Sequence, residues 1–385
     1  MSLPLKRPYP PMEAKSVDMI PVGPEWQYEP KWDGFRCLAF RDSDAIALQS
    51  KAGEPLERYF PEVVEALREV KARQFVVDGE IVIPKGKSLS FDDLLMRIHP
   101  AESRVKKLAA ETPAILIVFD LLVDEKGAPL VGLPLQERRP RLEEFASRFL
   151  AGHPSIRLSP ATPTPDVALR WFRETRGALD GVIAKRRDMP YRSGDRTGMQ
   201  KIKQRRTADC VVGGFRYASA GRVIGSLLLG LYDEKGLLHH VGFTSGLAAP
   251  ERKALVPKLE ALVKPPGFTG HAPGGPSRWS TERSTEWQPL QAKLVVEVEY
   301  DHVTGGRFRH GTRFMRWRPD KAPGQCTFEQ IERPEGSMLG LLGAGDARSA
   351  RKKAPAATKK PRAIRKKVAA KSLPRSNPRT RRSTP

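Results

Sequence analysis

The sequence predicts an α+β fold with two domains and a disordered basic tail. Strand-like runs alternate with helical ones up to about residue 206, and strand-like runs dominate from there to about residue 335. The remainder is rich in Ala, Lys, Arg, Pro and Ser. With 385 residues, 39% of them hydrophobic, the chain is long and apolar enough for two cores. We expect an extended lead-in, a first domain, a second domain and the tail, at residues 1–25, 26–206, 207–335 and 336–385.

The first domain is predicted from two apolar runs and three helix starts. Residues 75–83 and 114–119 are rich in β-branched and apolar side chains, which is typical of buried strands. Pro61, Ser90 and the Thr164-Pro pair each precede a segment with helical spacing, and Ser90 resembles a capping residue. The mixture indicates helices packed on a sheet.

The second domain is predicted to be a small β-barrel with one helix, at 250–263. The expected strands are 209–215, 226–232, 239–244 and 294–300. Residues 264–280 contain Pro-Pro and Gly-Gly pairs and are expected to form a loop.

The positive charge is concentrated at the C-terminus. The net charge is +23, and residues 348–385 hold 15 Lys and Arg with no Asp or Glu, which leaves 23 − 15 = +8 for the rest. This distribution indicates a polyanionic partner, either nucleic acid or an anionic membrane surface.

Cysteine usage and hydropathy favour a cytoplasmic protein with no membrane partner. The three cysteines, Cys37, Cys210 and Cys326, form no Cys-x-x-Cys pair, so neither a cysteine-rich zinc ribbon nor a disulfide framework is expected. The N-terminus lacks an apolar export segment, and the most apolar stretch, 114–123, is too short to cross a bilayer.

Two acidic strands and a lysine carry the candidate chemistry. Lys31 stands in a Lys-Trp-Asp-Gly motif, where it is either a nucleophile or an ordinary surface lysine beside a turn. Asp78 and Glu80 lie on one face of a predicted strand, because strand side chains alternate with period two. Asp180 precedes another apolar run, so two acidic strands could together bind Mg²⁺; solvated strand edges are the alternative.

Cations and aromatic rings supply candidate phosphate and base contacts. Lys201 and Lys203 flank Ile202 and share one face of a strand, so both could contact one phosphate, although the surrounding basic cluster also resembles a solvated loop. Phe119 is a candidate base-stacking ring or a core residue. Residues 307–318 interleave cations with aromatics, which suits either nucleic-acid contact or an amphipathic edge strand.

Together these motifs resemble the covalent nucleotidyltransferases, and most closely the ATP-dependent DNA ligases. The resemblance runs from about residue 26 to 330 and is nearest to the compact bacterial enzymes akin to ligase C and the catalytic module of ligase D. It implies an adenylation (nucleotidyltransferase) domain followed by an OB-fold domain. Lys31 would carry AMP as a lysyl phosphoramidate, and ATP with Mg²⁺ or Mn²⁺ would be the cofactors.

The resemblance also implies roles for other residues. Lys51 stands where the family usually has arginine, Asp180 stands where it has glutamate, and Gln200 replaces a common aromatic. The implied nucleotide-binding residues are Glu29, Arg36, Lys51, Glu80, Phe119, Lys185, Lys201 and Lys203. The implied metal ligands are Glu80 and Asp180, and the C-terminal adenylation motif is Arg318, Asp320 and Lys321. The candidate DNA contacts are Arg192, Arg309, Arg313 and Arg316.

The implied function is the sealing of nicks in duplex DNA, in DNA repair, by a monomer associated with the bacterial nucleoid. DNA end-joining or repair proteins are the expected protein partners. Two alternatives stay open. An RNA ligase or a capping-type guanylyltransferase shares the lysine motif, and a non-catalytic DNA-binding protein could retain the fold.

Overall fold

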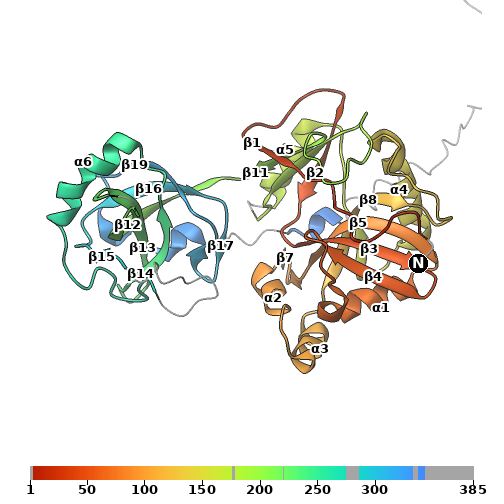
Figure 1. The fold of residues 1–385 in the computed structure, drawn as a ribbon, viewed down its shortest axis with the longest axis horizontal. Coiled ribbons are helices and arrows are strands. Elements are labelled where there is room, and N and C mark those ends of the chain that lie inside the picture. Colours follow the sequence, from red (N-terminus) through yellow and green to blue (C-terminus); the bar gives the residue numbers. More distant parts are fainter. Residues whose placement is uncertain (1–2, 176–177, 220, 275–285, 333–336, 343–385) are drawn as a thin grey trace, which may run out of the picture.

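The chain folds into two units joined through a short strand-to-strand connection (Figure 1). The computed structural model describes residues 3–175, 178–219, 221–274, 286–332 and 337–342. No helix in these ranges is long and apolar enough to span a bilayer. The first unit ends with β11 (Met199–Lys203), and the second begins with β12 (Arg206–Tyr217).

The first unit contains two main sheets. One has the order β4-β3-β5-β8-β9, with all pairs antiparallel except β8–β9. Its strands are β3 (Phe35–Asp42), β4 (Ala45–Ser50), β5 (Gln74–Val82), β8 (Ile115–Val123) and β9 (Ile156–Leu158). The other sheet has the order β1-β11-β10-β2, with β1 (Lys15–Val17), β2 (Trp26–Lys31) and β10 (Gly181–Arg186). A two-stranded hairpin, β6 (Pro84–Lys85) and β7 (Ser88–Leu89), follows β5.

Helices flank both sheets and bury their apolar side chains, and the last of these helices in the chain packs on β2 of the second sheet. They are α1 (Pro61–Glu69), α2 (Phe91–Met96), α3 (Glu102–Glu111), α4 (Leu135–Phe149) and α5 (Pro165–Glu174). The starts at Pro61, Ser90 and Pro165 are confirmed, and the Ser90 hydroxyl accepts a hydrogen bond from the Asp93 amide at 3.2 Å. Phe119 lies within β8 rather than at its end, because pairing with β5 continues to Val123.

The second unit is dominated by one antiparallel sheet of order β14-β13-β12-β16-β19, with β15 also paired to β12. Its further strands are β13 (Ile224–Tyr232), β14 (Leu238–Thr244), β15 (Gln288–Pro289), β16 (Val295–Tyr300) and β19 (Arg313–Trp317). A short hairpin of β17 (Val303–Thr304) and β18 (Arg307–Phe308) follows β16. The expected helix is present as α6 (Ala249–Glu260), and η4 (Phe328–Ile331) closes the unit.

Two terminal segments differ from the expectation. The lead-in contributes β1, which pairs with β11 in parallel, and it buries Leu3 and Met12. The prediction of disorder from residue 336 is wrong for residues 337–342, because three of their apolar side chains are buried against the first unit. The rest of the predicted tail, 343–385, lies outside the described residues.

Gly34 is required where the chain turns from β2 into β3. A Cβ built on Gly34 would lie 2.2 Å from the backbone oxygen of Ile81, which no side chain can occupy without backbone movement. We expect Gly34→Ala to lower the free energy of unfolding by about 1–3 kcal/mol. Gly132→Ala is the matched control, because a Cβ there meets nothing within 4 Å. Urea unfolding of both variants checks this, and equal midpoints would contradict it.

Candidate nucleotide-binding site

A cavity of about 230 Å³ opens in the first unit beside the end of β2. Strands from both main sheets reach it, and the lead-in covers part of it through Met12 and Glu13. Eight of the nine residues predicted to react with or bind the nucleotide line this cavity. They are Glu29, Lys31, Arg36, Lys51, Glu80, Phe119, Lys185 and Lys201. The ninth, Lys203, is not among the lining residues.

Lys31 ends β2 and faces a carboxylate on the neighbouring connection. The register pairs Lys31 with Gly181, so Asp180 comes directly beside the Lys31 amine and accepts its hydrogen bond. Burial alone would lower the pKa of Lys31, but Asp180, together with Asp33 and Glu80, raises it above its ordinary value. Burial would raise the pKa of Asp180. Contacts with Lys31 and His302 outweigh this effect and hold the pKa of Asp180 well below its usual range.

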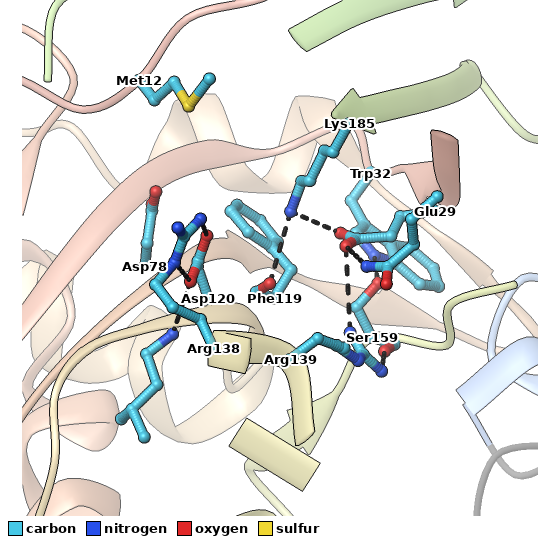
Figure 2. Close-up of polar contacts among 12 residues, drawn as sticks. Met12, Glu29, Trp32, Asp78, Phe119, Asp120, Arg138, Arg139, Ser159 and Lys185 are labelled. Atoms are coloured by element: carbon cyan, nitrogen blue, oxygen red, sulfur yellow. Dashed lines mark hydrogen bonds and ion pairs between the residues drawn. The ribbon is translucent and has the colours of Figure 1, made fainter. Parts of the chain in front are cut away.

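Glu29, two residues before Lys31, is held almost completely buried by polar partners (Figure 2). Lys185 donates to Glu29 Oε2 at 2.7 Å, and Gln27 donates to Oε1 at 3.0 Å. Arg139 Nη1 lies 3.9 Å from the same Oε1. These contacts fix the carboxylate at the wall of the cavity.

Two cations lie close to the ring of Phe119. The Arg36 guanidinium carbon and the Lys185 amine each lie 4.6 Å from its ring centroid, within the range of a cation–π contact. Asp78 orients Arg36 through two hydrogen bonds of 2.5 and 2.6 Å and also accepts one of 2.6 Å from the Tyr191 hydroxyl. Asp78, whose strand was expected to help bind Mg²⁺, is bonded to Arg36 and is not among the residues that line the cavity, so its role as a metal ligand stays a prediction.

Some supporting residues were missed by the sequence reasoning. Asp120, on the strand that carries Phe119, forms a buried bidentate pair with Arg138 of α4, with both hydrogen bonds 2.9 Å long (Figure 2). Ser159 accepts from the Trp32 indole at 2.9 Å, which fixes the residue next to Lys31. The position of Asp120 beside Phe119 in an apolar run indicates a buried carboxylate that needs a partner. The sequence does not indicate that this partner is Arg138, 18 residues later.

Glu80 lies opposite Arg36 in the pairing of β3 with β5 and is partly buried. Burial, opposed by the positive charges of Arg36 and Lys31, raises the pKa of Glu80 to about 7. A different set of residues brings its ligand atoms together: one each from Asp33, Asp180 and His302, all within 4.8 Å of one another. Of the two predicted metal ligands, only Asp180 belongs to this cluster.

The predicted phosphate-binding lysines occupy different positions. Burial, and then the charges of Lys203 and Lys31, lower the pKa of Lys201, which lines the cavity. Lys203 instead donates to Asp301 of the second unit at 2.6 Å. Lys51 is 58% exposed and lies 3.1 Å from Glu13 at the rim.

The second unit reaches the site through the segment after β16. His302 contacts Asp180, and Arg309 donates to Asp33 at 3.0 Å while its guanidinium lies over the Phe91 ring. Asp33 therefore receives two contacts from the second unit, which was not apparent from its place in the lysine motif.

The structure does not bring the predicted C-terminal motif to the cavity. Arg318 donates to Asp209 at 2.8 Å and pairs with Asp320, while Lys321 lies 3.4 Å from Asp209, all within the second unit. The four candidate DNA contacts are likewise dispersed between the units. Arg192 lies near Asp195 in the first unit, and Arg309 of the second unit donates to Asp33. Arg313 and Arg316 are on β19, where Arg316 is bonded to Glu297.

Comparison with known proteins identifies the family. The ATP dependent DNA ligase domain matches residues 11–203, and the ATP dependent DNA ligase C terminal region matches residues 220–321. DNA ligase C of Mycobacterium tuberculosis is 45% identical over 351 residues, covering 87% of this chain and 96% of that protein. DNA ligase C2 of Mycolicibacterium smegmatis is 44% identical over 352 residues, covering 87% and 97%.

A solved structure of a Lig E DNA ligase has the same fold, with a TM-score of 0.50 and 16% identity, over 80% of this chain and 99% of that one. The two family matches together span both units and more than half of the chain. This chain therefore belongs to the ATP-dependent DNA ligases.

Proposed function

We propose that this ligase seals nicks in duplex DNA with ATP, using Lys31 as the nucleophile that carries AMP. The observation that supports this most directly is the position of Lys31 in a cavity with Phe119 and several other cations. An aromatic ring and clustered cations suit the base and phosphates of a nucleotide. The membership of the chain in the ligase family supplies the reaction.

The reaction has three displacements at phosphorus. The neutral Lys31 amine attacks the α-phosphate of ATP, so that a P–N bond forms and pyrophosphate leaves. The 5′-phosphate of the nick then attacks the adenylyl phosphorus, and the lysine is released. Finally the 3′-hydroxyl attacks the activated 5′-phosphate, which forms the phosphodiester bond and expels AMP. Positioning and charge neutralisation supply most of the catalysis.

The lining residues divide between base, sugar and phosphates. Phe119 stacks on adenine, and the fixed Glu29 carboxylate accepts hydrogen bonds at the same end of the cavity. Arg36, oriented by Asp78, contacts the sugar. The remaining lysines neutralise phosphate oxygens: Lys51, Lys185, Lys201 and Lys203. Lys203 can do so only after it leaves Asp301, with which it is paired here.

A divalent cation fits the cluster of Asp33, Asp180 and His302. The two carboxylates suit either Mg²⁺ or Mn²⁺, whereas the imidazole favours Mn²⁺ over Mg²⁺. Such an ion would neutralise charge that develops on the α-phosphate. The protein's own part is to hold Asp180 ionised at neutral pH, which its lowered pKa supports. Glu80 remains a further candidate ligand that stands outside this cluster.

We further propose that the second unit is an OB-fold, with the domain boundary near residue 206. The helix α6, which packs on β13, and the sheet through β12 support this assignment. The motif of Arg318, Asp320 and Lys321 would orient the pyrophosphate during self-adenylation. This requires the second domain to present another face, since none of these three residues lines the cavity in this structure.

Nicked double-stranded DNA is the proposed substrate, contacted by arginines of both domains: Arg192, Arg309, Arg313 and Arg316. Repair of DNA, with end-joining or repair proteins as partners, is the proposed context. We propose a monomer that acts in the cytoplasm at the bacterial nucleoid.

The basic tail should strengthen DNA binding without sequence preference. Ending the chain after Gly345 removes 15 Lys and Arg with one acid, Asp346. We expect about tenfold or greater weakening for a nicked duplex at low salt, and a shallower slope of affinity against salt concentration. Scrambling residues 346–385 is the matched control and should preserve the affinity. An unchanged affinity after truncation, measured by fluorescence anisotropy, would show that the tail does not contact DNA.

The proposed activity is tested by ligation of matched nicked substrates. Nicked DNA and nicked RNA of the same sequence are each incubated with ATP or GTP and a divalent cation. Sealing of DNA with ATP alone supports the proposal. Preferred sealing of RNA, or labelling of the protein by GTP, would favour an RNA ligase or guanylyltransferase, and neither labelling nor sealing would indicate a non-catalytic DNA-binding protein.

A further inference from the structure

A short segment beyond the second unit returns to the first unit. Met338, Leu341 and Leu342 are 2%, 4% and 5% exposed. The Leu339 amide donates to the carbonyl oxygen of Lys87, between β6 and β7, at 3.3 Å. Figure 1 shows this short blue segment among the strands of the first unit, apart from the rest of the blue chain in the second.

The segment joins an apolar cluster that also backs the nucleotide cavity. Met338, Leu341 and Leu342 belong to the same contiguous cluster as Trp32 and Phe119. These two rings line the cavity beside Lys31. Because three large apolar side chains in six residues are removed from water, the hydrophobic effect strongly favours binding of this segment to the surface.

We propose that residues 337–342 are a C-terminal anchor, which binds an apolar surface of the nucleotidyltransferase domain and so attaches the second domain to it at both ends. The occupant of this surface is the chain's own segment. If residues 337–342 were not bound to the first unit, Leu341 and Leu342 would be exposed to water. The structure buries both side chains instead.

The anchor limits how far the second domain can move. On one side only Gln204 and Arg205 connect β11 to β12. On the other side residues 332–337 connect η4 to Met338, and a fully extended chain of this length spans at most about 25 Å. Any reorientation that carries Ile331 farther than this from the anchor must release it. Smaller reorientations can occur with both ends attached.

The anchor also sets where the basic tail begins. Leu342 precedes Arg348, the first residue of the basic stretch, by only six positions. The tail's 15 cations therefore remain attached near the catalytic domain in every reorientation of the second domain that leaves the anchor bound. Electrostatic contact with a polyanion would then persist through the reorientation.

The test uses the full chain with Met338→Asp and Leu341→Asp, which places two charges on the apolar surface. Hydrogen exchange measured by mass spectrometry should rise at least tenfold in residues 337–342 and in the β6–β7 hairpin. Met315→Asp is the matched control, since Met315 is 43% exposed on β19, and exchange in both regions should remain as in the wild type. The Met338→Ala and Leu341→Ala pair replaces the aspartates if that variant fails to fold.

A labelled peptide of residues 333–347 provides the second measurement. It should bind saturably to the full-length double variant, whose surface is vacated, and at least tenfold more weakly to the wild type, whose surface is filled. A peptide carrying the two aspartates should bind neither. Unchanged exchange in the double variant, or equal peptide binding by both proteins, would overturn the anchor. Neither measurement involves ATP or DNA, so its outcome is independent of the ligase activity.

Discussion

Replacing Lys31 with alanine should abolish covalent labelling of the protein by ATP and lower nick sealing by at least about 10⁴-fold, because the variant lacks the proposed nucleophile. Intact-mass measurement after incubation with ATP and Mg²⁺ should show an adenylyl adduct on the wild type and none on the variant. Lys31→Arg is the matched control for charge. It keeps a cation beside Asp180 but cannot provide a neutral amine, so it should fail in the same way.

A pre-adenylated nick separates chemistry from folding in this experiment. When AMP is already on the 5′-phosphate, the last displacement needs no lysine nucleophile. Both Lys31 variants should then seal this substrate far better than an ordinary nick supplied with ATP. An adduct that persists in Lys31→Ala would mean that another side chain is the nucleophile. Failure of the variant on the pre-adenylated nick as well would indicate a disrupted site.

The sequence predicted local features of this fold well. The helix starts at Pro61, Ser90 and Pro165 depend on residues within one turn of each other, and all three are observed. The apolar run at 114–119 lies in a central strand, since burial on both faces leaves a continuous apolar signal. Most nucleotide residues also gather as expected, because the family resemblance carried information about distant strands.

What the sequence did not reveal depends on contacts between distant segments. His302 approaches Asp180 only because the second domain presents the end of β16 to the first. The partner of Asp120 is Arg138 on α4, a choice that no local pattern specifies. The anchor was hidden for a different reason. Its few apolar residues stand beside a long basic tail, so average composition predicted disorder there.

Replacing Asp180 with asparagine should change both the rate and the pH dependence of self-adenylation. We expect the maximum rate to fall by about 10²–10³-fold, because a charged group beside the reacting atoms is lost. Asp188→Asn is the matched control, because Asp188 is an exposed carboxylate paired with Arg186 away from the cavity. It should leave both quantities unchanged.

The direction of the pH effect follows from the pKa of Lys31. Asp180 is the largest of the carboxylate influences that raise this pKa, and only the neutral amine can attack phosphorus. Removing its charge should therefore lower the pKa of Lys31 and displace the rising limb of the rate profile toward lower pH. Nitrogen NMR of the lysine Nζ in the metal-free protein measures this shift directly. A higher pKa in Asp180→Asn would contradict the pairing, since burial without the carboxylate can only disfavour the ammonium form.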